Sequence, residues 1–178
     1  MIRTRLIRVD DAPVLARLLV VNREFMAPWS PIRDEIYYTD DGQRALIREL
    51  LERHERGETL PHVVISAKPD GVPGEVIGAI TLSGIVRGPF QSGNLGYWID
   101  AAHNGRGIAT AATGEIVRIA FDKLGLHRIQ AGTLVHNGAS QKVLQRNGFE
   151  RFGLAPNYLK IAGRWQDHVL FQVVAPAG

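Results

Sequence analysis

Apolar residues recur along this chain with two different periods, and the changes between them mark the expected secondary structure. Spacings of three and four residues predict a helix that begins after residues 10–13, and a second that runs from Asp40 or Asp41 to about Gly57. Between them, the prolines of residues 22–31 predict a loop, because proline lacks the N–H that a helix requires. The helical period returns later and predicts helices over residues 105–124 and 139–146.

Alternating patterns and short apolar runs predict the strands. These cover residues 2–9, 62–68, 76–86, 95–99 and 127–135, followed by a terminal hairpin of residues 149–161 and 165–174. The second to fourth strands are expected to form an antiparallel meander, with a turn at residues 69–71. Since no repeat, low-complexity tract or long linker divides the chain, we expect one domain over residues 1–178 that mixes helices and strands.

Composition excludes several kinds of chemistry. The 178 residues contain no cysteine, which removes disulfides, zinc–thiolate sites and cysteine-linked acyl intermediates. The six histidines show no metal-ligand spacing, so no metal site is expected. The chain has no run of about 18 apolar residues, the length that a helix needs to span a bilayer, and its N-terminal segment differs from a signal peptide. We therefore expect a cytoplasmic protein without a membrane partner. The net charge of +3 comes from scattered arginines, and no direct nucleic-acid contact is expected.

The glycines between an expected strand and the helix that follows form the most informative stretch. Residues 96–100 lead into residues 104–110, where Gly105 and Gly107 stand just ahead of the helix. Glycine lets backbone N–H groups approach an anion closely, and the helix N-terminus adds a partial positive charge, so a pyrophosphate is the expected ligand. The stretch does not match the dinucleotide-binding fingerprint, because Thr110 occupies the position of its third glycine. The chain also lacks the Gly-Lys-Ser/Thr sequence of a Walker phosphate-binding loop. An ordinary glycine-containing helix start is the alternative.

Two motifs at matching spacing resemble those of the GNAT acetyltransferases. Residues 104–109 match the family signature Gln/Arg-x-x-Gly-x-Gly/Ala except at Asn104, whose shorter side chain shifts the expected contacts toward the backbone. Residues 137–149 resemble the Asn-x-x-Ser, Leu and Gly-Phe element that members carry after the fifth strand. The resemblance implies a three-layer α+β fold whose mixed, mostly antiparallel central sheet is splayed between strands 4 and 5, with helices on both faces.

The same resemblance implies acetyl-CoA as the co-substrate and assigns residues to it. The pantetheine arm would enter the splay and meet the backbone of Tyr97, Trp98 and Ile99, and Asn137 would also reach this arm. The pyrophosphate would lie on the turn and the helix start, at Asn104, Gly105, Arg106, Gly107, Ile108, Ala109 and Thr110. For Asn137 the alternative is an ordinary Asn-Gly turn.

Pro28-Trp29 and the tail over residues 158–169 are similar to the ribosomal-protein-alanine N-acetyltransferase branch of the family. The likeness implies acetyl transfer to a primary amine, the N-terminal α-amine of a protein such as a ribosomal protein, by a monomer or homodimer. Trp29 and Tyr158 would then contact the acceptor. The alternatives are acylation of a small amine (an antibiotic, an amino acid or a polyamine), acyl groups longer than acetyl, and a non-catalytic acyl-CoA sensor.

Direct attack by a neutral amine requires a route for the amine proton and a proton for the leaving thiolate. The resemblance implies Ser140 as the proton donor; capping of the helix that follows residue 137 is the alternative. Tyr158 is a second catalytic candidate, with hairpin packing as its alternative. Asn94 and Leu95 stand where many relatives place a glutamate, so no base is assigned. Water remains a candidate for this role, together with Glu24, Asp100 and His168.

Overall fold

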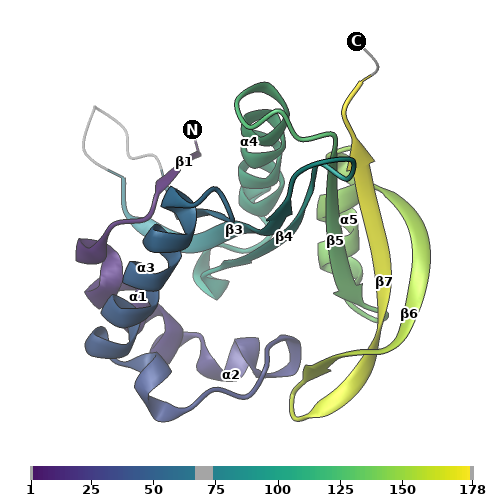
Figure 1. The fold of residues 1–178 in the computed structure, drawn as a ribbon. Helices are drawn as coiled ribbons and strands as arrows, with labels where there is room; N and C mark the ends of the chain where they lie inside the picture. Colours follow the sequence, from purple (N-terminus) through teal and green to yellow (C-terminus); the bar gives the residue numbers. More distant parts are fainter. Residues whose placement is uncertain (1, 67–73, 177–178) are drawn as a thin grey trace.

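The computed structural model describes residues 2–66 and 74–176, and a seven-stranded sheet runs through its centre (Figure 1). The strands lie in the order β1-β2-β3-β4-β5-β7-β6. Their bounds are Arg3–Leu6 (β1), Leu60–Ile65 (β2), Val76–Val86 (β3), Ser92–Ile99 (β4), Arg128–Leu134 (β5), Glu150–Ile161 (β6) and Arg164–Val174 (β7). All neighbours are antiparallel except β4 and β5, which are parallel. The expected mixed, mostly antiparallel sheet is therefore confirmed.

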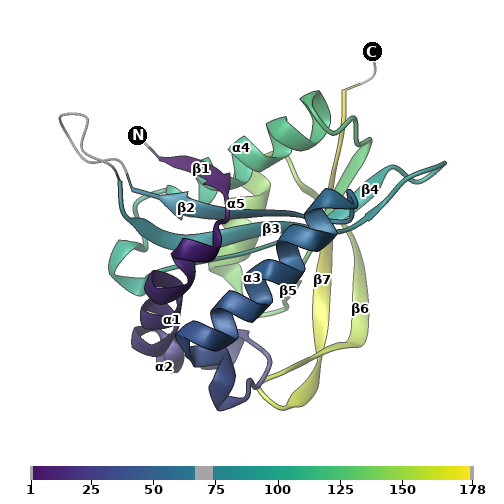
Figure 2. The same ribbon diagram turned by 60° about the vertical axis from the view of Figure 1, so that its left-hand side comes forward.

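Helices cover both faces of this sheet (Figure 2). They are α1 (Ala12–Val21), α2 (Arg23–Met26), α3 (Asp40–Glu55), α4 (Ile108–Asp122) and α5 (Gly138–Arg146). Successive residues of a strand point to opposite faces, so the fully buried neighbours Val63 and Val64 of β2 belong to separate cores. Val64 packs in the core that α4 and α5 cover, and Val63 packs with residues of α1 and α3. Strands covered on both faces are mostly apolar, and in β2 only His62 interrupts the apolar run.

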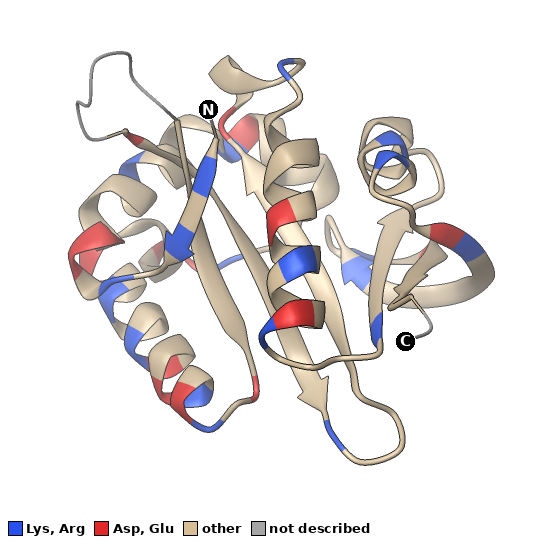
Figure 3. Ribbon diagram, turned by 90° about the horizontal axis from the view of Figure 1, so that it is seen from above, with Lys and Arg blue, Asp and Glu red and all other residues tan. Residues whose placement is uncertain are grey.

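The outer surfaces of the helices carry basic and acidic residues interspersed with one another (Figure 3). This distribution fits helices that bury one side against the sheet and expose the other to solvent. Among the described residues, no helix is long and apolar enough to cross a membrane.

The structure shortens the first expected strand. β1 ends at Leu6 instead of residue 9, because the chain enters a 3-10 turn at Val9–Asp11. Asp11 holds this turn: its carboxylate accepts the backbone N–H of Arg8 at 2.8 Å and pairs with the Arg5 guanidinium at 2.6 Å. The turn expected at residues 69–71 lies outside the described residues.

The prediction of a loop over residues 22–31 is wrong in part. The segment contains the short helix α2 and a 3-10 turn, η2 (Ala27–Trp29). Pro28 is compatible with η2 because it stands in the first turn, where its missing N–H has no helical partner to lose. A further 3-10 turn, η3 (Glu35–Tyr38), precedes α3.

Candidate active site

The parallel strands β4 and β5 separate soon after they begin. Ser92–Asn94 of β4 pairs with Arg128–Gln130 of β5, whereas the pairing of β4 with β3 continues to Ile99. Beyond Asn94, the backbone groups of β4 that face β5 therefore have no strand partner. A cavity of about 660 Å³ opens at this gap and is lined from β4, β5, α4 and α5. The predicted splay between strands 4 and 5 is confirmed.

The glycine-rich turn forms one end of this cavity. Gly105 and Gly107 have φ angles of +76° and +73°, and a Cβ placed on either would meet no atom within 4 Å. Gly107 is the N-cap of α4, so the free N–H groups of the first turn of this helix lie beside the glycines. Both glycines line the cavity. An open turn at a helix N-terminus is the arrangement that accommodates a phosphate group.

The loop between β4 and the glycines is held by a buried amide. Asn22, at the end of α1, donates from Nδ2 to Asp100 Oδ1 at 3.0 Å and accepts the backbone N–H of Ala101 at 2.8 Å. His103 Nδ1 lies 3.0 Å from the other Asp100 oxygen. Burial alone would raise the pKa of Asp100, but the hydrogen bonds from Asn22 and His103 lower it overall. Both carboxylate oxygens of Asp100 thus have partners that hold the loop, which argues against Asp100 as the base that accepts the amine proton.

Ser140 is not the cap of α5, so that alternative is wrong. Asn137 is the N-cap, and its side-chain oxygen accepts the backbone N–H of Ser140 at 3.1 Å. The Ser140 hydroxyl lines the cavity and lies 2.8 Å from the hydroxyl of Tyr97 on β4. Burial raises the pKa of Tyr97, although the bond to Ser140 partly offsets the rise. Tyr97 is therefore a neutral phenol that can donate to Ser140, which leaves the serine proton free to point into the cavity.

His168 lies on the opposite face of the sheet from Ser140. It pairs with Leu134, whereas the adjacent Val169 packs in the core that α5 covers. The imidazole is 3% exposed and lines the same cavity. Its Nδ1 lies 2.9 Å from the carbonyl oxygen of Gln166, so Nδ1 carries the proton of the neutral ring. Nε2 is then a lone-pair acceptor, and no hydrogen bond to it comes from the described part of the chain.

Two further residues shape the cavity. Trp29, from η2, lines it and packs against His136 with the ring centroids 5.4 Å apart. Thr133 of β5 also lines it, and its buried hydroxyl has no hydrogen-bond partner among residues 2–66 and 74–176. An orphaned buried hydroxyl beside the unpaired edge of β4 fits a ligand that supplies hydrogen-bonding groups to the gap.

A family model described as "Acetyltransferase (GNAT) domain" matches residues 2–150. The chain belongs to the GNAT acetyltransferase family. It is accordingly an acetyl-CoA-dependent N-acetyltransferase. The open turn, the gap beside β4 and the orphaned Thr133 hydroxyl are compatible with coenzyme A at this site.

Individual relatives match nearly the whole chain. It is 39% identical over 175 residues to "Probable N-acetyltransferase YjcK" of Bacillus subtilis (strain 168), covering 98% of this chain and 94% of the relative. It is 36% identical over 172 residues to "[Ribosomal protein uS5]-alanine N-acetyltransferase" of Escherichia coli (strain K12), with 97% and 87% coverage. The solved structure of Mycobacterium smegmatis RimJ in complex with CoA-disulfide superposes with a TM-score of 0.91 at 30% identity, with 98% and 82% coverage.

Most of the residues predicted for this GNAT site lie around one cavity. It is lined by Trp29, Tyr97, Trp98, Ile99, Asn104, Gly105, Gly107, Ile108, Ala109, Thr110, Asn137 and Ser140. Arg106 and Tyr158 are not in this lining. Tyr158 is 47% exposed and packs its ring edge against His168, as in the hairpin-packing alternative. Sequence reasoning missed the side-chain roles of Asn22, Tyr97 and Thr133, because no local motif marks them.

We expect Gly107→Asn to weaken coenzyme A binding about ten-fold or more, equivalent to about 1.4 kcal/mol. Asparagine tolerates the left-handed conformation, so the added side chain would occupy the open turn without unfolding it. Gly57→Asn is the matched control, because Gly57 has φ +74°, an equally open surrounding and a position at the end of α3, outside the cavity lining. Calorimetric titration of both variants measures the effect, and equal affinities would contradict the phosphate-binding turn.

Proposed function

We propose that this enzyme acetylates the N-terminal α-amine of a protein, such as a ribosomal protein, by direct attack of the amine and without an acyl-enzyme. The observation that carries the proposal is the continuous cavity, which has Ser140 on one face of the sheet and His168 on the other. An acceptor can therefore approach from the face opposite the glycine-rich turn. The similarity to the uS5-alanine N-acetyltransferase over 97% of the chain supports a protein acceptor.

The approach to the cavity suits the end of an extended chain. Phe25 and Trp29 line the cavity and are 48% and 39% exposed. The turn between β6 and β7 joins the same side of the opening, where the backbone N–H of Ala162 donates to the carbonyl oxygen of Ser30 at 2.9 Å. An α-amine with a pKa near 8 is partly neutral at physiological pH, whereas lysine, near 10.4, is almost fully protonated. The α-amine is thus the better nucleophile for a site without a strong base.

His168 serves as the base in this proposal. Of the three side chains considered, Glu24 is exposed and outside the cavity lining, and Asp100 is held by Asn22 and His103. Nε2 of His168 would accept the proton from the attacking nitrogen, directly or through one water. Acetyl-CoA supplies the thioester, and backbone N–H groups at the open edge of β4 would polarise its carbonyl.

Ser140 completes the proton balance on the other face. As the bond from nitrogen to the carbonyl carbon forms and the carbon–sulfur bond breaks, Ser140 would donate its proton to the sulfur. Tyr97, 2.8 Å away, would return a proton to the serine oxygen and regain one from solvent, to which His168 gives up the proton that it accepted. Proton acceptance and proton donation thus take place on opposite faces of the sheet.

A thiol-release assay with acetyl-CoA tests the acceptor class. We expect rapid release with peptides that begin with Ala or Ser, and none when the same peptides are N-terminally blocked but keep an internal lysine. Mass spectrometry should find one acetyl group on the first residue. Release with small amines alone would contradict the proposal in favour of small-molecule acylation, and coenzyme A binding without release in any reaction would favour a sensor.

We expect His168→Ala to lower kcat about 10²- to 10⁴-fold while leaving coenzyme A affinity nearly unchanged. Added imidazole should restore part of the rate, because it can occupy the space left by the side chain. His54→Ala is the matched control: its Nδ1 also lies 2.9 Å from a backbone carbonyl, that of Thr59, but His54 is not in the cavity lining. A His168→Ala enzyme with undiminished kcat, or one that imidazole does not stimulate, would contradict the base assignment.

A further inference from the structure

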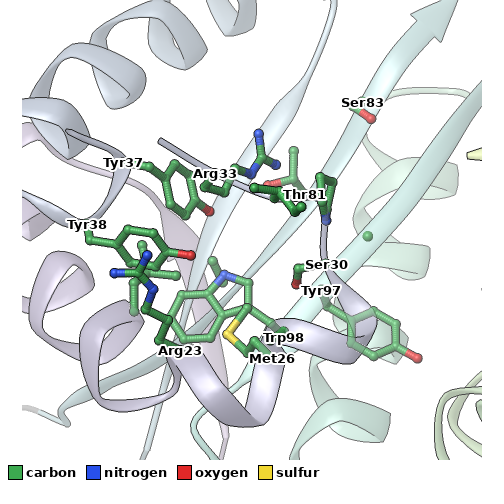
Figure 4. Close-up of a pocket in the computed structure, with 16 residues that line it drawn as sticks. Arg23, Met26, Ser30, Arg33, Tyr37, Tyr38, Thr81, Ser83, Tyr97 and Trp98 are labelled. Carbon is green, nitrogen blue, oxygen red and sulfur yellow. The ribbon is translucent and has the colours of Figure 1, made fainter. Parts of the chain in front are cut away.

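A second cavity of about 530 Å³ adjoins the first on the face that α1 covers. Figure 4 shows its side chains converging from α2, η3, β3 and β4. The two cavities share wall residues, namely Met26, Ser30, Gly96, Tyr97 and Trp98. An acceptor whose amine reaches the gap between β4 and β5 would therefore place neighbouring groups in this second cavity.

The charged residues of the second cavity are both basic. Arg23 and Arg33 line it, and no aspartate or glutamate of the described segments does. Arg23 is already paired, since Nη1 donates to Glu35 Oε2 at 3.0 Å, and its guanidinium lies 4.2 Å from the ring centre of Tyr38. Of these two arginines, Arg33 is the one without a carboxylate partner among the described residues.

Arg33 is held in place without being neutralised. Its guanidinium lies 4.8 Å from the ring centre of Tyr37, an arrangement that fixes the side chain through a cation–π contact. It makes no ion pair or hydrogen bond with any other described residue. Burial raises the pKa of Tyr37, which the charge of Arg33 partly offsets, so the phenol stays neutral and can donate a hydrogen bond. An oriented guanidinium beside hydrogen-bond donors is suited to a carboxylate.

We propose that the second cavity binds a carboxylate of the acceptor, and that Arg33 determines a preference for N-terminal peptides with an acidic residue next to the first. This inference rests on the proposed protein acceptor. The charge of Arg33 acts against a polyamine, because a guanidinium that is not paired with a carboxylate repels additional cations. Arg33 is a specificity residue here and takes no part in proton transfer.

The test compares acetylation of peptides that begin Ala-Glu, Ala-Gln and Ala-Lys and are otherwise identical. For the unmodified enzyme we expect kcat/KM to be about ten-fold higher for Ala-Glu than for Ala-Gln, and lowest for Ala-Lys. Arg33→Gln should bring the Glu and Gln values together, and Arg33→Glu should reverse the preference toward Ala-Lys. Arg33→Lys keeps the charge and should therefore retain a weaker preference for Ala-Glu. Unchanged coenzyme A affinity of each variant shows that it is folded.

Arg48→Gln provides the control, because Arg48 is an exposed residue of α3 outside both cavity linings. It should leave all three kcat/KM values unchanged. Equal transfer to the three peptides by the unmodified enzyme would overturn the role of Arg33 and leave the proposed function intact. Transfer to no peptide would overturn the protein acceptor and this inference together.

Discussion

After Asn94 and Gln130, β4 and β5 diverge, and the peptide groups that face the gap lose the partners a continuous sheet would provide. Unpaired backbone in a largely buried setting is costly unless another molecule pairs with it. The gap therefore does two things at once: it opens a passage through the sheet, and it creates a row of hydrogen-bonding groups for an extended, amide-containing ligand. The rest of the site is arranged around this passage.

Several long-range contacts connect the elements around the gap. Tyr97 reaches from β4 to Ser140 on α5, Asn22 ties the end of α1 to the loop after β4, and Trp29 packs on His136 after β5. Each contact joins segments far apart in the sequence. Together they fix the distances among the glycine-rich turn, the gap and the side of the cavity that His168 lines. Direct transfer requires reacting groups that are held at such fixed distances.

The features that local sequence patterns could predict are those that local interactions determine. Periodicity predicted the bounds of β3 and α3 to within two residues. The glycines ahead of α4 indicated an anion site, because anion binding there depends on the backbone of the glycines themselves. The contacts of Asn22 and Tyr97 with residues 78 and 43 positions away have no such signature. Ser140 shows the limit well: asparagine and serine are both good caps, and only the folded chain shows that Asn137 takes that position.

Hydrogen exchange of the backbone amides, measured with and without coenzyme A, tests the central claim most directly. If the gap is completed by the ligand, exchange should slow in the second half of β4 (residues 95–99), and in the turn and helix start at residues 104–110. The strands β6 and β7 are already paired with each other except around residues 156–158, so their paired amides should change little. Protection absent from residues 95–99 despite saturating coenzyme A would contradict the account, because the unpaired edge of β4 would then not be the ligand's partner.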